Sequence, residues 1–201
     1  MRDLCEHVRG PDYPTAAEII TPAADLQAMY ETGAGSVRAR GVFVKEHANI
    51  VITELPHGVS CRQVIEEIEA LVNPKAPTGK KEVSLEQRRL KQFVLEQVET
   101  VRDESDRKSR LRLVIEPRSS RQDENELMAA LMVHTSLETR YPVNLTWLGL
   151  DGLPETKGIV DILSEWGEFR VRTVRRRTEF RLAKCEARLH IVEGRLKAFA
   201  K

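Results

Sequence analysis

The sequence predicts an α+β fold, in which a mixed or antiparallel sheet packs against helices and is followed by a long C-terminal coiled-coil helix. Stretches that alternate between apolar and polar residues, such as 36–44, are bounded by glycine or proline, as strands usually are. Stretches with apolar residues three and four apart, such as 60–72, indicate amphipathic helices. The strands and helices do not follow one another in regular β-α-β order, which disfavours a parallel α/β sheet.

The first 55 residues are predicted to form an ordered loop, a helix and three strands. Two prolines and a glycine make the loop, and Gly33 ends the helix. The last two strands are expected to pair as a hairpin through a polar loop at 46–48. The expected elements are a loop at 10–15, a strand at 18–20, a helix at 22–30 and strands at 36–44 and 49–55.

Residues 60–201 are predicted to contain four helices and two strands. Ser60 is a suitable N-cap for the first of these helices. Two prolines, a glycine and three lysines at 73–81 indicate a connector before the second helix. The expected elements are helices at 60–72, 84–98 and 124–133, strands at 111–116 and 143–150, and a helix from about 157 to the end.

An apolar seam runs along the C-terminal segment. Apolar residues recur there at alternating spacings of three and four, the heptad pattern of a coiled coil. An isolated helix would leave this stripe in water, so we expect either that two chains associate here or that a returning helix of a longer chain covers it. The apolar seam consists of Leu182, Cys185, Leu189, Val192, Leu196 and Phe199.

Cysteine usage and hydropathy bear on the cellular compartment. The three cysteines are odd in number and lie far apart, which favours free thiols over a disulfide framework. No apolar run approaches the roughly 18 residues that a membrane span requires, and the N-terminus lacks the form of a signal peptide. We therefore expect a soluble, cytoplasmic protein with no membrane partner.

The sequence offers little for catalysis by this chain alone. Its five histidines are scattered, and none forms a zinc-ligand pattern with the cysteines. It has neither the glycine-rich P-loop that holds ATP nor a nucleophile-elbow motif. The charged cluster at 102–106 is interpreted as a salt-bridged turn. We expect no catalytic residue, no metal and no cofactor in this segment.

Charge is unevenly distributed along the chain. The 32 lysines and arginines nearly cancel the 31 acidic residues, so the net charge of +1 favours no class of partner. Six arginines within 170–181, however, form a basic stripe on the predicted terminal helix. That stripe fits nucleic-acid binding and the solvated flank of a coiled coil equally well. Arg38 and Arg40 form a second basic face on the strand at 36–44.

Short motifs occur in a fixed order along most of the chain. They are GPDYPT at 10–15, EII at 18–20, YETGAGSVRAR at 30–40, ELPHGVS at 54–60, RDESD at 102–106, LVIE at 113–116, LGLDG at 148–152, ILSEW at 162–166, RRRT at 175–178 and HIVEG at 190–194. Together they resemble the DNA-breaking (A-type) subunits of bacterial type IIA DNA topoisomerases. The Leu-Pro-His and Gly-Leu-Asp-Gly variants are more similar to topoisomerase IV than to gyrase.

The resemblance implies a domain organisation. Residues 1–156 would be the tower domain, including a connector and an inserted helix at about 73–98. Residues 157–201 would begin the coiled-coil arm that leads to the exit gate, and an antiparallel helix beyond Lys201 would cover the apolar seam. The nucleophilic tyrosine of the family would precede the motif at 10–15 and so lie outside this chain, whereas Tyr141 would be structural.

The resemblance also implies a function. The whole enzyme would be an isomerase that decatenates or relaxes DNA with ATP, and this segment, inactive alone, would support and help bend the gate duplex. Its partners would be double-stranded DNA, the topoisomerase IV B-type subunit and a second A-type subunit, close to the nucleoid. Mg²⁺ and ATP would be handled mainly by the B-type subunit. We expect Arg38, Arg40 and Lys45 to contact DNA; the alternative is a non-enzymatic coiled-coil interaction module.

Three features depart from the family pattern. Ala34 stands where the family usually has an arginine between two glycines, and Cys61 stands where lysine or glycine is often found. The segment at 73–98 is longer than the family pattern by roughly twenty residues, judged against ordinary connection lengths. We interpret it as a lineage-specific helix that extends the tower.

Overall fold

A computed structural model of the chain describes residues 2–75, 83–119 and 123–200. The chain forms two compact units, which are described separately: Gln27–Ala34 with Asn144–Lys201, and Arg2–Leu26 with Gly35–Val143. Antiparallel strand pairs and a long C-terminal helix are present, so the predicted α+β class is confirmed. The predicted division at 156/157 stays a prediction.

The larger unit, Arg2–Leu26 with Gly35–Val143, contains most of a three-stranded sheet in the order β1-β2-β7. In β2, Val37 and Ala39 are buried while Arg38 is exposed, which confirms the alternation predicted for this strand. A short helix, α1, precedes the sheet and was not predicted. The elements are α1 (Arg2–His7), β1 (Glu18–Ile19), β2 (Ala34–Arg40) and β7 (Glu138–Asn144).

The strand predicted at 36–44 is two strands in two different sheets. It breaks at Gly41, where the backbone N–H donates to the Leu137 carbonyl at 2.8 Å. A Cβ at Gly41 would lie 2.8 Å from the carbonyl oxygen of Glu54, so the close backbone approach here requires glycine. Residues after the break pair with β4, so the expected hairpin exists, but it does not include Arg38 and Arg40.

The second sheet has four antiparallel strands in the order β3-β4-β6-β5. The β3–β4 turn contains His47, whose φ of 57° is in the left-handed region. The strands predicted at 49–55 and 111–116 are confirmed, whereas β5 was not predicted. The strands are β3 (Val42–Glu46), β4 (Asn49–Glu54), β5 (Val98–Asp103) and β6 (Leu113–Pro117).

Three helices pack with this sheet around the core, and all three were predicted. Ser60 caps α3 by accepting from the N–H of Gln63 at 3.2 Å, and Ser84 forms a capping box with Gln87 at the start of α4. The helices are α3 (Cys61–Val72), α4 (Leu85–Gln97) and α5 (Glu124–His134). The connector predicted at 73–81 lies largely outside the described residues.

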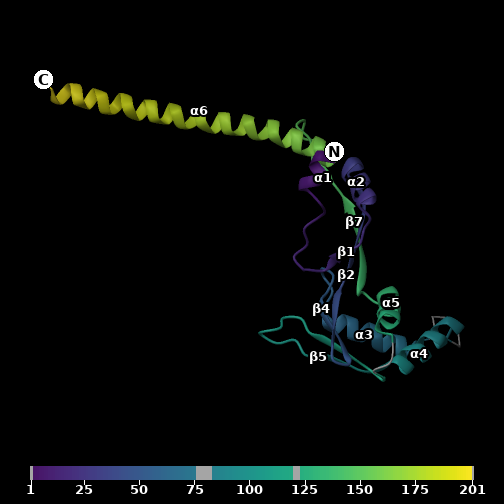
Figure 1. Cartoon of the computed structure of the whole chain (residues 1–201). Helices are drawn as coiled ribbons and strands as arrows, with labels where there is room; N and C mark the ends of the chain where they lie inside the picture. Colours follow the sequence, from purple (N-terminus) through teal and green to yellow (C-terminus); the bar gives the residue numbers. More distant parts are fainter. Residues whose placement is uncertain (1, 76–82, 120–122, 201) are drawn as a thin grey trace. The chain divides into compact units, whose positions relative to one another are not determined.

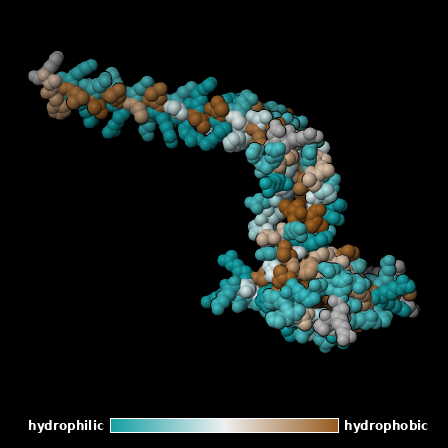
Figure 2. All heavy atoms as spheres, in the orientation of Figure 1, coloured by the Kyte–Doolittle hydropathy of each residue, from teal (hydrophilic) through white to brown (hydrophobic). Residues whose placement is uncertain are grey.

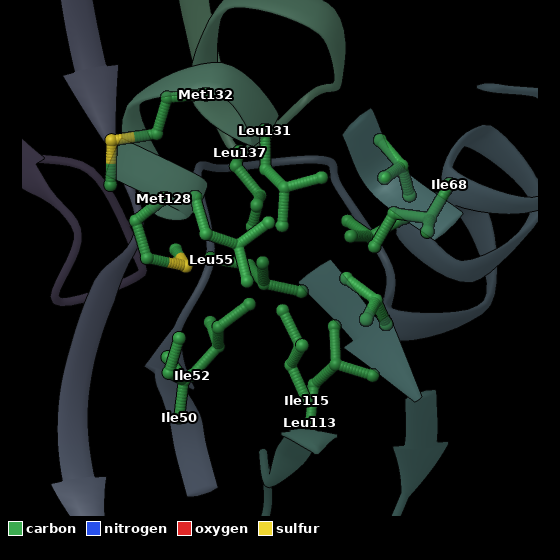
Figure 3. Packing of buried hydrophobic residues seen from close by; sticks show 14 residues of the cluster. Ile50, Ile52, Leu55, Ile68, Leu113, Ile115, Met128, Leu131, Met132 and Leu137 are labelled. Carbon is green, nitrogen blue, oxygen red and sulfur yellow. The ribbon is translucent and has the colours of Figure 1, made fainter. Parts of the chain in front are cut away.

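The core of this unit lies between the four-stranded sheet and these helices. In Figure 3 the side chains of Ile52 from β4, Ile115 from β6 and Leu131 from α5 point into one cluster. All three are at most 1% exposed, which indicates close packing. This core fixes β3, which carries Lys45, together with β5 and β6.

The smaller unit joins the end of α2 to the long helix α6. Gly33 has a φ of 75°, and its carbonyl accepts a hydrogen bond from the N–H of Leu145 at 2.7 Å. The strand predicted at 143–150 is interrupted there, and the chain continues as a short hairpin. The elements are α2 (Ala23–Thr32), β8 (Thr146–Leu148), β9 (Pro154–Thr156) and α6 (Ile159–Phe199).

Helix α6 is one continuous helix of 41 residues (Figure 1). Ile162 near its start is buried, whereas Leu182 and Leu196 of the apolar seam are 56% and 64% exposed. None of the helices within the described ranges has the length and apolar composition needed to cross a membrane. The continuous helix from Ile159 to Phe199 confirms the long C-terminal helix that the sequence predicts.

Candidate nucleic-acid interface

Arg38 and Arg40 converge on one carboxylate. Arg40 donates to Glu138 Oε2 through Nη2 at 2.9 Å and through Nε at 3.2 Å. Arg38 Nη1 lies 3.6 Å from Glu138 Oε1. Glu138 comes from β7, the neighbour of β2 in the sheet. Two guanidinium groups thus share a single carboxylate, which leaves positive charge on this strand face.

Other charged residues extend this face of the three-stranded sheet. Arg140 lies two positions along β7 from Glu138, so it faces the same side, and it is exposed. Glu18 of β1 lies opposite Arg40 and contributes a negative charge. The charged residues of this face that are named here are three arginines and two glutamates, so their balance is positive.

Lys45 lies in the other sheet. Its Nζ is 3.0 Å from Glu124 Oε2, at the first turn of α5. Asp123, the N-cap of α5, accepts from the N–H of Asn125 at 2.9 Å. Lys45 therefore offsets carboxylates gathered at a helix N-terminus. The structure brings Arg38 and Arg40 together but not Lys45 with them.

The basic stripe of α6 is mostly without counter-ions. Arg172 lies 3.4 Å from Glu168, one helical turn away. Glu165 instead pairs with Lys157. Among the described residues, the remaining arginines of the stripe form no ion pair: Arg170, Arg175, Arg176, Arg177 and Arg181.

Comparison with known proteins identifies the family. The family model for the A-type subunits of DNA gyrase and topoisomerase IV matches residues 1–201. The chain belongs to that family. Its relatives include the A-type subunits of DNA topoisomerase 4 from Pseudomonas aeruginosa, 50% identical over 197 residues, from Escherichia coli K12, 47% over 196 residues, and from Neisseria gonorrhoeae, 43% over 202 residues. Each alignment covers 98% of this chain, and the resemblance inferred from the motifs is confirmed.

The chain spans about a quarter of the length of these relatives: 24% of the Pseudomonas and Escherichia proteins and 26% of the Neisseria protein. It therefore represents one segment of an A-type subunit of the gyrase/topoisomerase IV family. No three His, Cys, Asp or Glu side chains in the described part of the chain form a group that could hold a metal ion.

Tyr141 is held in an aromatic cluster of this segment. Its hydroxyl donates to the carbonyl of His57 at 2.7 Å, and its ring centroid is 5.0 Å from that of Tyr13. Tyr13 also stacks on the His57 ring at 6.2 Å. Burial, and then the nearby Tyr13, raise the pKa of the Tyr141 hydroxyl. A neutral, hydrogen-bonded hydroxyl suits a structural role better than nucleophilic attack.

Sequence reasoning missed Glu138, the residue that brings the two predicted arginines together. It lies 98 positions from Arg40, and no local pattern links them. Of the family departures, Cys61 is half-buried and its Sγ lies 3.8 Å from Ser105 Oγ, while Ala34 is the first residue of β2. The position of Cys61 is therefore a packing site within the larger unit.

Proposed function

We propose that this chain is a DNA-supporting segment of a topoisomerase IV A-type subunit. In the whole enzyme it holds the arms of the duplex that is cut and helps to bend them, while the nucleophilic tyrosine is supplied by another part of the protein. The whole enzyme is then an isomerase that decatenates or relaxes DNA with ATP. Membership of the gyrase/topoisomerase IV family supports this assignment.

The observation that carries the proposal is the sharing of Glu138 by Arg38 and Arg40. Both arginine side chains are partly exposed, at 46% and 38%. An ion pair at this level of exposure contributes about 1 kcal/mol or less, so a phosphate can replace the carboxylate at little cost. Guanidinium groups bind phosphate oxygens through two parallel hydrogen bonds. Lys45 is a further candidate contact, with Glu124 as its competing partner.

Such contacts act through charge and not through base recognition. Contacts to phosphate fix the position of a duplex without reading its sequence. Bending a site of a few tens of base pairs costs on the order of 1 to 6 kcal/mol, which several phosphate contacts can offset. A segment that supports gate DNA of any sequence needs this kind of contact.

The remaining requirements of the reaction fall to other parts of the assembly. We assign Mg²⁺ and ATP mainly to the B-type partner, and this segment is expected to be inactive alone. A second A-type subunit completes the enzyme, which acts in the cytoplasm on the nucleoid. Helix α6 begins the arm to the exit gate, and an antiparallel helix from the rest of the protein covers its apolar seam.

The test is fluorescence anisotropy of a duplex of roughly 40 base pairs, titrated with this chain at several salt concentrations. The Arg38→Ala/Arg40→Ala variant should bind more weakly, and its log–log salt slope should be smaller by about 2, because each phosphate contact contributes about 0.9. The Arg62→Ala/Arg89→Ala variant, altered at two exposed cations, matches its net charge and should retain the slope. Absence of binding at low salt, or equal losses in both variants, would contradict the proposal.

The exposed apolar seam favours one alternative, a coiled-coil interaction module that pairs with a second copy. Leu189 and Val192 are 56% and 40% exposed, as residues that pack against a partner helix would be in the unpaired chain. Figure 2 shows hydrophobic residues at the surface along the long helix. On this alternative, sedimentation equilibrium would show a dimer that persists at high salt, and binding to the duplex would be absent.

A further inference from the structure

Three exposed cations lie close together in the loop that joins β5 to β6. This β5–β6 loop comprises residues 104–112, and Arg107, Lys108 and Arg110 are exposed within it. None of the three makes an ion pair with any residue in the described ranges. Figure 1 shows the chain extending beyond β5 in this loop. Its sequence also contains carboxylates, so the positions of those acids decide whether the loop is basic.

The carboxylate of Asp106 is turned inward on the loop backbone. Its Oδ1 accepts from the N–H of Ser109 at 2.6 Å and from the N–H of Lys108 at 2.7 Å. These backbone hydrogen bonds, from Ser109 first, lower the pKa of Asp106. The Asp106 N–H in turn donates to the Ser109 carbonyl at 2.8 Å. The carboxylate therefore orders the turn, and its hydrogen bonds are to backbone N–H groups.

Glu104, at the base of the loop, is paired with Arg102 of β5 and with Arg112 at the end of the loop. Glu104 Oε2 lies 3.3 Å from Arg112 Nε, and its Oε1 lies 3.4 Å from Arg102 Nε. Arg112 is also fixed by two hydrogen bonds to Glu46 of β3, at 2.8 and 2.7 Å. The salt bridge predicted within 102–106 is present, but residues 102 and 103 belong to β5 and the turn lies at 106–109. These ion pairs anchor the loop to the four-stranded sheet. Residues 104–112 contain four cations and two acids, so the loop itself keeps a net positive charge.

What remains is a preorganised site for polyanions. The loop has hydrogen bonds at its turn and at its base, so little backbone conformational entropy is lost when its cations bind a ligand. Arg107, Lys108 and Arg110 make no ion pair with a described residue, whereas Arg38 and Arg40 must exchange Glu138 for a phosphate. No aromatic residue lies in 104–112 to stack on a base. The chemistry therefore fits the sugar-phosphate backbone of a duplex and not the bases.

We propose that the β5–β6 loop is a second phosphate-contacting element of this segment, in which Arg107, Lys108 and Arg110 bind the backbone of duplex DNA. The inference rests on the proposed function and deepens it, because it assigns the contact to residues outside the three-stranded sheet. Two separate contact elements on one segment hold a duplex at two places along its length. The loop contact does not depend on the phosphate contact made by Arg38 and Arg40, and it adds to the binding of the duplex.

The experiment compares the unaltered chain with the Arg107→Ala/Lys108→Ala/Arg110→Ala variant, using a fluorescent duplex of roughly 40 base pairs at several salt concentrations. The loop variant should bind at least roughly tenfold more weakly at low salt, and its log–log salt slope should fall by about 2 to 3. The matched control is Arg62→Ala/Lys75→Ala/Arg89→Ala, which removes three exposed cations outside the loop. The Arg107→Lys/Arg110→Lys variant keeps the charge and should retain the slope.

The outcomes separate the inference from the function on which it rests. If the unaltered chain binds and the loop variant binds equally well, or loses no more than the matched control, the loop inference is wrong and the proposed function stands. If the unaltered chain does not bind the duplex at low salt, both are wrong. The loop substitutions should leave the fold intact, because the three side chains are exposed. Far-ultraviolet circular dichroism of each variant checks this.

Discussion

At the scale of residues, the charge of this segment depends on how its cations share counter-ions. The net charge of +1 conceals that Glu138 serves both Arg38 and Arg40, while Glu124 pairs with Lys45. Exposed pairs of this kind are weak and easily exchanged. Because two arginines share one carboxylate, we expect them to bind a phosphate more readily than Lys45 does. Composition could not reveal this difference, because it depends on tertiary contacts.

Tyr141 allows a residue-scale prediction about stability. In Tyr141→Phe the hydrogen bond to the His57 carbonyl is lost, and the free energy of unfolding should fall by about 0.5 to 1 kcal/mol near neutral pH. The pKa of the Tyr141 hydroxyl is raised in the folded chain. The contribution of the hydroxyl to the free energy of unfolding is therefore fully present below the pKa of the unfolded chain, near 10, and is lost as the pH rises through the pKa of the folded chain.

Denaturant titrations of both proteins at neutral pH and above about pH 10, the ordinary pKa of tyrosine, measure this difference. DNA cleavage by the whole A-type subunit carrying Tyr141→Phe, in complex with its partner, should be unchanged. A loss of cleavage with unchanged stability would mean that Tyr141 acts in the chemistry, contrary to its position in the cluster.

At the scale of elements, Gly41 separates two sheets that a sequence pattern merges into one strand. The alternation of residues 36–44 is continuous, so period-2 reasoning predicts a single strand and places Arg38 and Arg40 on the hairpin. The break arises from the approach of the Glu54 carbonyl, a contact between residues that are not neighbours in sequence. An isolated glycine in a strand pattern is the one local signal of such a break.

Gly41→Ala tests this role. A Cβ at this position would lie 2.8 Å from the Glu54 carbonyl oxygen, so the backbone must shift, and the free energy of unfolding should fall by about 1 to 3 kcal/mol. Gly194→Ala is the matched control: nothing lies within 4 Å of its Cβ, and alanine favours the helix by about 0.5 to 1 kcal/mol. Thermal unfolding measures both. If the Gly41→Ala variant were as stable as the parent, the steric argument would be refuted.

Local signals accounted for most elements, and tertiary contacts account for the rest. The helices α3 and α5 and the strand β4 were predicted because caps and apolar spacing act within a few residues. β5 was missed because its pairing with β6 across the charged loop defines it as a strand. Glu138 was missed because its ion pair with Arg40 joins residues that lie 98 positions apart in the sequence. The sequence could not show that the loop cations make no ion pair, because the hydrogen bonds of Asp106 to backbone N–H groups are seen only in the structure.

At the scale of the whole molecule, we propose different tasks for two surfaces of the segment. Charged residues of the larger unit suit a duplex backbone, and the exposed apolar seam of α6 suits another helix. Both assignments agree with a segment that spans about a quarter of its relatives among the topoisomerase 4 A-type subunits. The central claim is that the charged surfaces support the bending of gate DNA.

The most direct measurement is fluorescence energy transfer between dyes at the two ends of a duplex bound by the whole A-type subunit in complex with its B-type partner. We expect high transfer with the unaltered enzyme and lower transfer with Arg38→Ala/Arg40→Ala at saturating enzyme, because lost phosphate contacts no longer offset the cost of bending. Equal transfer in both enzymes would contradict the claim and leave the segment a scaffold without a part in bending DNA.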